Sequence, residues 1–201
     1  MALTISGTSN GKLGNLSLSA NTGDILDSAN TTFFGVDLWY ITANINASGT
    51  VVTMNTNWAR LADTAVTNAS NPSFTYSSNM TGSIGSGMTE SSGVFTFPST
   101  GIWHIDWRCA VVNTSASDDF YYPFIVLSTD NFSTEGSQIL GTDNVRASTR
   151  TAGQRVNCVF DVQDTSNYKC RFEVGSLSTG YARGGTNYME NYVMFMRLGD
   201  T

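Results

Sequence analysis

The sequence predicts an all-β protein, organised as an antiparallel two-sheet sandwich or jelly roll. Composition is the first observation, because 87 of the 201 residues are Ser, Thr, Asn or Gly, which favour turns over helices. Lys occurs twice and Glu four times, so the usual helix-forming residues are scarce. Patterning is the second: short stretches alternate apolar and polar side chains with the period of two typical of β-strands.

The predicted strands begin near residue 33 and continue to the end of the chain. Pro98 closes one strand before Gly101 opens the longest, and Pro123 predicts an edge position or a bulge. Turn-forming clusters separate the strands, and no repeat of 20–50 residues is present. In order, the strands span residues 36–42, 50–54, 93–97, 102–112, 120–128, 156–162, 168–174 and 191–198.

The chain divides into two unequal parts. Residues 1–32 are rich in Ser, Asn, Gly and Thr and carry only short alternating pairs, which indicates an extended N-terminal arm that attaches to a partner. Residues 33–201 contain the long alternating stretches and form the predicted jelly-roll domain.

Charge and targeting signals exclude several classes. The net charge of −6 and the pI near 4.5 disfavour a nucleic-acid partner, because the chain has no positive field for phosphates. No secretory signal follows Met1, and the apolar stretches are shorter than the roughly 20 residues of a membrane span. We therefore expect synthesis in the cytoplasm without membrane insertion.

The three cysteines, Cys109, Cys158 and Cys170, are an odd number and lie in strand-like stretches. They show no Cys-x-x-Cys or Cys/His spacing, so we interpret them as buried, reduced thiols.

Catalytic chemistry has little support in the sequence. The single histidine, His104, precedes Asp106 by two residues on the same strand face, but no recognisable turn supplies a nucleophile. The acidic pairs at 118–119 and 161/164 lack the ligand spacing of a calcium loop. The glycine-rich 82–87 precedes no helix pattern, as a phosphate cradle would require. The sequence predicts no enzyme, cofactor or metal.

The aromatic residues Trp39, Tyr40 and Trp58 are a candidate contact site. Exposed aromatic faces stack on sugar rings, so these residues are candidates for a glycan or partner surface. Packing in the core or between subunits explains the same pattern, and the sequence leaves both interpretations open.

The stretch SSGVFTFPSTGIWHIDWRCAV (91–111) resembles the signature of the complement one-q globular head and the related tumour-necrosis-factor jelly roll. The matching positions are Gly93, Phe95, Thr96, Pro98, Gly101 and Trp103. Over about residues 36–200 the chain is similar to tailed-phage virion proteins, especially those of marine phages. The segments that carry this similarity are NWARLAD, GSGMTESSGVFTFPSTGIW, DTSNYKCRFEV and MRLGD. The usual Tyr-rich central strand is replaced here by IWHIDWR, and no collagen-like repeat precedes the domain.

The resemblance implies a homotrimer in which one sheet of each chain faces a three-fold axis. It places His104, Asp106 and Arg108 at that axis, with Asp106–Arg108 ion pairs between chains. The alternative is that this face belongs to a solvated or groove-facing strand. The opposite face and later strands then supply the core residues Trp103, Ile105, Trp107, Phe160 and Phe172.

The resemblance also implies a non-enzymatic structural protein of a bacteriophage virion. A trimeric capsid decoration protein, held on the major capsid protein by residues 1–32, is the first expectation, because the sequence shows no fibre shaft. A tail-fibre or tail-tip adhesin that binds host-surface glycan is the alternative, and a polysaccharide-active enzyme is third.

Overall fold

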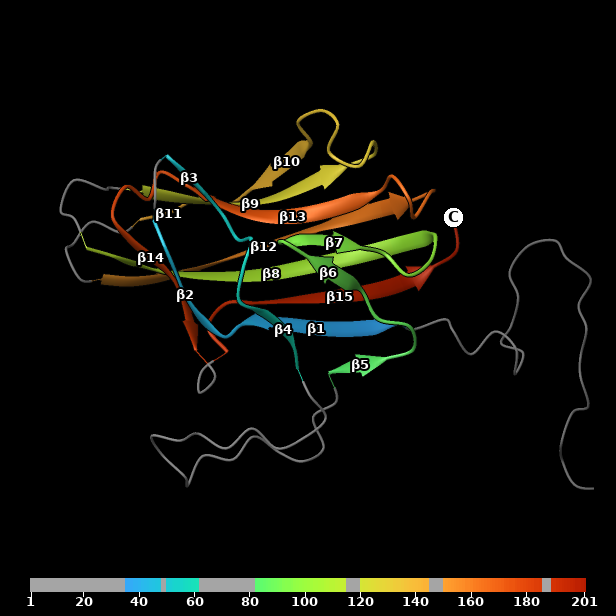
Figure 1. Cartoon of the computed structure of the whole chain (residues 1–201), viewed down its shortest axis with the longest axis horizontal. Coiled ribbons are helices and arrows are strands. Elements are labelled where there is room, and N and C mark those ends of the chain that lie inside the picture. Colours follow the sequence, from blue (N-terminus) through green and yellow to red (C-terminus); the bar gives the residue numbers. More distant parts are fainter. Residues whose placement is uncertain (1–34, 48–49, 62–81, 115–119, 145–149, 186–188) are drawn as a thin grey trace, which may run out of the picture. The chain divides into compact units, whose positions relative to one another are not determined.

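A computed structural model describes residues 35–47, 50–61, 82–114, 120–144, 150–185 and 189–201 (Figure 1). Every element in these ranges is a β-strand, which confirms the all-β prediction. The described part of the chain contains no helix that is long and apolar enough to cross a membrane. The predicted arm at 1–32 lies outside the described residues.

The strands form two antiparallel sheets. The eight-stranded sheet contains β1 (Val36–Ile41), β2 (Ala43–Asn46), β4 (Trp58–Arg60), β5 (Ser83–Ile84), β8 (Gly101–Asn113), β12 (Arg150–Val162), β14 (Gly180–Gly185) and β15 (Tyr192–Gly199). The seven-stranded sheet contains β3 (Val51–Thr53), β6 (Thr89–Ser91), β7 (Val94–Thr96), β9 (Phe120–Ser128), β10 (Ser137–Leu140), β11 (Asp143–Asn144) and β13 (Lys169–Gly175).

The strand order identifies the topology. One sheet contains the neighbours β1, β15, β8 and β12, and the other contains β7, β13, β9 and β10. Numbered along the chain, these eight main strands give the orders 1-8-3-6 and 2-7-4-5, so the chain repeatedly crosses between the sheets. This arrangement is a jelly roll, as the sequence predicted.

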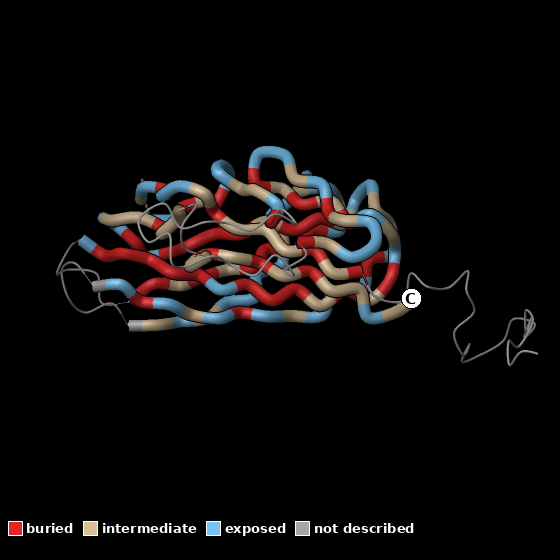
Figure 2. Tube along the Cα trace, turned by 90° about the horizontal axis from the view of Figure 1, so that it is seen from below, coloured by how far each residue is buried: buried red, intermediate tan, exposed pale blue. Residues whose placement is uncertain are grey.

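The core lies between the sheets, where Figure 2 shows buried residues along the strand interiors and exposed residues at many turns. The side chains of Trp103, Ile105, Trp107 and Phe172 are at most 1% exposed. Phe160 is half-buried and stacks on Tyr168, with ring centroids 5.5 Å apart. Burial of these large side chains contributes to the apolar driving force for folding.

The buried side chain of Asn191 completes the pairing of β8. On one side β8 pairs with β15 up to Arg108 and with β14 from Val111 onward, which leaves Ala110 between the two strands. The Asn191 amide donates to the Ala110 carbonyl at 2.6 Å and accepts from the Ala110 N–H at 3.0 Å. It also donates to the Arg183 carbonyl, so one side chain joins three strands.

Pro123 lies within β9 rather than at a sheet edge or bulge, because β13 pairs with it through Val174. Its carbonyl accepts from the Gly141 N–H at 3.0 Å, on the side where β10 ends and β11 begins. The proline nitrogen has no hydrogen to return a bond to Gly141, so the ladder is interrupted between β10 and β11.

Candidate functional site

The candidate site is the face of the eight-stranded sheet that points away from the core, which we call outer face A. Alternate residues of β12, β8, β15 and β1 point to it, because their neighbours fill the core. Cross-strand pairing aligns it in three rows: Val159, His104, Met196, Val36 and Ile84; Asn157, Asp106, Met194 and Leu38; Arg155, Arg108, Tyr192, Tyr40 and Ala59.

Apolar side chains dominate the first row. Val159 at one end is 60% exposed and Ile84 at the other is 52% exposed, while Val36 and Met196 between them are half-buried. Met194 and Leu38 continue the apolar surface into the second row. The apolar surface therefore covers β15, β1 and β5, and His104 lies between it and Val159. An apolar surface across a sheet is typical of a protein–protein contact.

The predicted axis residues His104, Asp106 and Arg108 all lie on outer face A, on alternate positions of β8. The pairing between Asp106 and Arg108 of neighbouring chains stays a prediction, and within one chain Asp106 has a different partner. Its carboxylate accepts from the Nε of Arg155 at 2.9 Å and lies 2.8 Å from Nη2. Sequence reasoning missed Arg155, because the register between β8 and β12 is set by long-range pairing.

The Asp106–Arg155 pair also separates two like charges. Arg155 is directly opposite Arg108 in the ladder, an arrangement that is unfavourable when both charges are unpaired. Asp106 neutralises Arg155, and its charge and hydrogen bond hold the pKa of Arg155 above the usual value. Arg108 is exposed and makes no ion pair with any described residue, so it leaves one positive charge in the third row.

The candidate aromatic residues do not gather on one surface. Trp39 and Trp58 turn toward the core, where each packs edge-on against Phe95 at 5.5 and 5.2 Å between ring centroids. The Trp58 indole N–H donates to the Met54 carbonyl. Tyr40 points the other way, to the third row of outer face A. These residues therefore form no shared platform for a sugar ring, and packing explains both tryptophans.

A buried carboxylate that the sequence analysis did not single out organises the end of β1. Asp37 is 1% exposed and accepts hydrogen bonds from Arg60, from the Trp39 indole and from the Met88 N–H. The Arg60 guanidinium also lies over the Trp39 ring, 4.8 Å from its centroid. Every donor satisfies the same buried charge, so we assign this network a structural role.

The described residues bring together no group of three or more His, Cys, Asp or Glu side chains that could hold a metal ion. The Asp106 carboxylate is bound to Arg155, so it does not orient His104 as a general base would require. Asp164 accepts hydrogen bonds from Ser166 and Asn167 within its own turn, while residues 118–119 lie outside the described ranges.

The three cysteines form no disulfide. Cys109 and Cys170 are buried and Cys158 is half-buried. Burial raises the pKa of all three thiols, that of Cys158 to about 11. The cysteines thus have the character of small packing residues.

Comparison of the sequence with protein-family models found no match, and comparison with curated proteins found none either. Two crystal structures of murine APRIL, a TNF-family ligand, are similar in structure. At pH 8.0 the TM-score is 0.48 with 9% identity, and at pH 5.0 it is 0.49 with 10% identity. Each alignment covers 82% of this chain and 99% of the other. At these identities the likeness concerns the fold alone, and the strand order given above carries the jelly-roll assignment.

Proposed function

We propose that this protein is a non-enzymatic structural component of a bacteriophage virion that assembles as a homotrimer through outer face A. The observation that carries the assembly step is the first row, in which apolar side chains lie on both sides of His104, from Val159 to Ile84. Association through a face of this kind is favourable, because a second apolar surface excludes water from it.

The charges on the face fit an assembly between copies of the same chain. Asp106 and Arg155 neutralise each other within one chain, so bringing copies together buries no unpaired carboxylate. Arg108 belongs to the third row, beside Tyr192 and away from the apolar first row. The apolar rows then approach the axis while Arg108 stays at the margin of the contact.

The virion role rests on the resemblance of residues 36–200 to tailed-phage proteins. Within the virion we propose capsid decoration, with the N-terminal segment 1–32 contacting the major capsid protein. A domain built from paired strands suits a protein exposed on a particle surface, since pairing and trimer contacts cover strand edges.

Cryo-electron microscopy of purified particles, with this chain traced in the density, tests the role. Decoration predicts jelly-roll trimers distributed over the capsid shell, in hundreds of copies per particle by quantitative mass spectrometry. Density confined to the tail end, with tens of copies at most, would replace decoration by receptor binding. Absence of the chain from purified particles would overturn the virion role altogether.

A further inference from the structure

We propose that the outward face of the seven-stranded sheet binds a neutral glycan, with Tyr122 and Phe124 of β9 as its stacking platform. Alternate residues of β9 divide between two faces: Tyr121 and Ile125 are fully buried in the core, whereas Tyr122 and Phe124 are half-buried on the opposite side. Phe120, two residues before Tyr122, is 42% exposed and extends the aromatic stripe. These aromatics lie on the other sheet from outer face A, so the proposal does not rest on the trimer.

Gly175 of β13 makes room for the Phe124 ring. It is directly opposite Tyr122 in the ladder, and a Cβ atom there would lie 2.7 Å from Cε2 of Phe124. The Phe124 ring therefore covers the backbone of β13 where any other residue would push it away. The Tyr122 and Phe124 ring centroids are 6.4 Å apart with 31° between the planes, so the two rings present neighbouring, similarly inclined surfaces.

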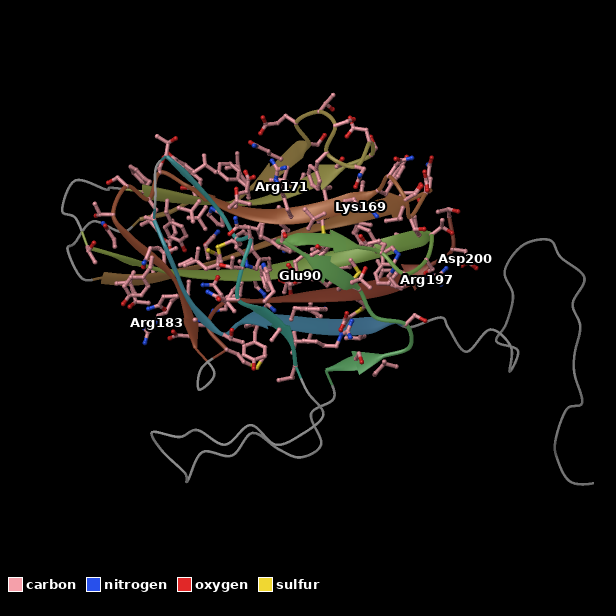
Figure 3. All side chains as sticks on the ribbon, in the orientation of Figure 1. Glu90, Lys169, Arg171, Arg183, Arg197 and Asp200 are labelled. Carbon is pink, nitrogen blue, oxygen red and sulfur yellow. The ribbon has the colours of Figure 1, made fainter. Side chains whose placement is uncertain are left out.

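Hydrogen-bonding groups lie next to the rings. Glu173 is directly opposite Phe124 and accepts from the Nε of Arg171 at 2.7 Å. Figure 3 labels Arg171, which belongs to β13. The Arg171 guanidinium lies over the Phe132 ring, 4.4 Å from its centroid, and its terminal nitrogens bond to no described residue. Thr53 of β3 is paired with Glu173 on the other side. Glu173 is only 5% exposed, so its carboxylate orients Arg171 rather than meeting a ligand itself. Rings flanked by a guanidinium and a hydroxyl match the C–H faces and hydroxyl groups of a pyranose.

The charge balance selects a neutral ligand. Arg171 is neutralised by Glu173, so the platform has no surplus cation for a phosphate or an acidic sugar. The chain as a whole carries a net charge of −6, which repels anionic polymers. Charged groups beside the rings also disfavour a purely apolar partner, because such a partner would remove water from them without replacing its hydrogen bonds. The hydroxyl groups of a sugar can replace those hydrogen bonds. A second copy of the chain is the competing occupant.

The test is titration calorimetry of the full chain with neutral hexasaccharides of glucose, mannose, galactose, xylose and N-acetylglucosamine, and with hexagalacturonate as the acidic comparison. We expect one or more neutral hexasaccharides to bind and hexagalacturonate not to bind. Tyr122→Ala should weaken binding by about tenfold or more, since one stacked ring is lost. Tyr181→Ala is the matched control, because this half-buried tyrosine pairs with β8 in the other sheet, and it should bind like the wild type.

Three results would overturn the glycan site. The first is that no neutral hexasaccharide binds the wild-type chain. The second is binding that survives Tyr122→Ala with unchanged affinity. The third is a fall in assembled mass caused by Tyr122→Ala, which would identify a second copy as the occupant. Each is independent of where the chain lies in a virion, so failure of the glycan site and failure of the virion role are separate outcomes.

Discussion

Arg155 on β12 binds the carboxylate of Asp106 on β8 with two nitrogens, at 2.8 and 2.9 Å, and so satisfies a charge on an otherwise largely apolar sheet face. The Asp106 side chain is 11% exposed and that of Arg155 is 58% exposed. The ion pair is therefore partly screened by solvent. It neutralises the Asp106 charge within one chain, so a second chain that contacts this face need not supply a cation.

Removal of Arg155 should weaken the fold. Arg155→Gln leaves the Asp106 carboxylate nearly buried without its two donors, and we expect the free energy of unfolding to fall by about 1–2 kcal/mol. The measurement is urea unfolding followed by circular dichroism. Arg108→Gln is the control, since Arg108 is exposed, and it should change the free energy of unfolding by less than about 0.5 kcal/mol. Equal losses from the two variants would show that Arg108 shares the carboxylate.

Removal of the Asn191 amide should lower the free energy of unfolding more than removal of Arg155 does. Asn191→Leu introduces an apolar side chain of similar size and leaves the N–H and C=O of Ala110 without partners in the interior. We expect the free energy of unfolding to fall by about 2–4 kcal/mol, because buried polar groups would lose their hydrogen bonds. Thermal and urea unfolding check this. A variant as stable as the wild type would contradict the joining role assigned to Asn191.

The thiols should be slow to react in the folded protein. The thiolate is the reactive form, and burial raises the pKa of Cys158 to about 11, so little thiolate is present at pH 8. Because the folded pKa is raised, the folded state loses stability as the pH rises above the ordinary thiol pKa, where the unfolded chain ionises first. A chromogenic disulfide reagent at pH 8 should count three thiols per chain in denaturant and react far more slowly without it. Rapid reaction of a thiol in the native protein would show an accessible thiolate.

The sequence predicts the fold well because its information is local and periodic. Alternation at 102–112 assigns Trp103, Ile105 and Trp107 to one face and His104, Asp106 and Arg108 to the other, and the structure has the same division. Long strands show a clear alternation of apolar and polar residues, because one side of the strand must be apolar to fill the core.

The candidate sites depend on pairing that the sequence does not contain. Nothing local indicates that Arg155 reaches Asp106, because the register of β12 against β8 joins residues 49 positions apart. Likewise, Trp39 is a candidate surface aromatic in the sequence, but it packs edge-on against Phe95 of β7 in the other sheet. The platform of Tyr122 and Phe124 depends on Gly175, which only the pairing of β9 with β13 brings beneath the ring.

The central claim, association through outer face A, is tested most directly by native mass measurement of the wild type and two variants. Val159→Glu places a charge on the most exposed apolar residue of the face, and Leu140→Glu, at a residue 55% exposed on the other sheet, is the matched control. We predict a mass three times the 21.6 kDa of one chain for the wild type and for Leu140→Glu. Val159→Glu should give mainly single chains. A wild-type protein with the mass of one chain, or a Val159→Glu variant that keeps the full assembly, would contradict the account.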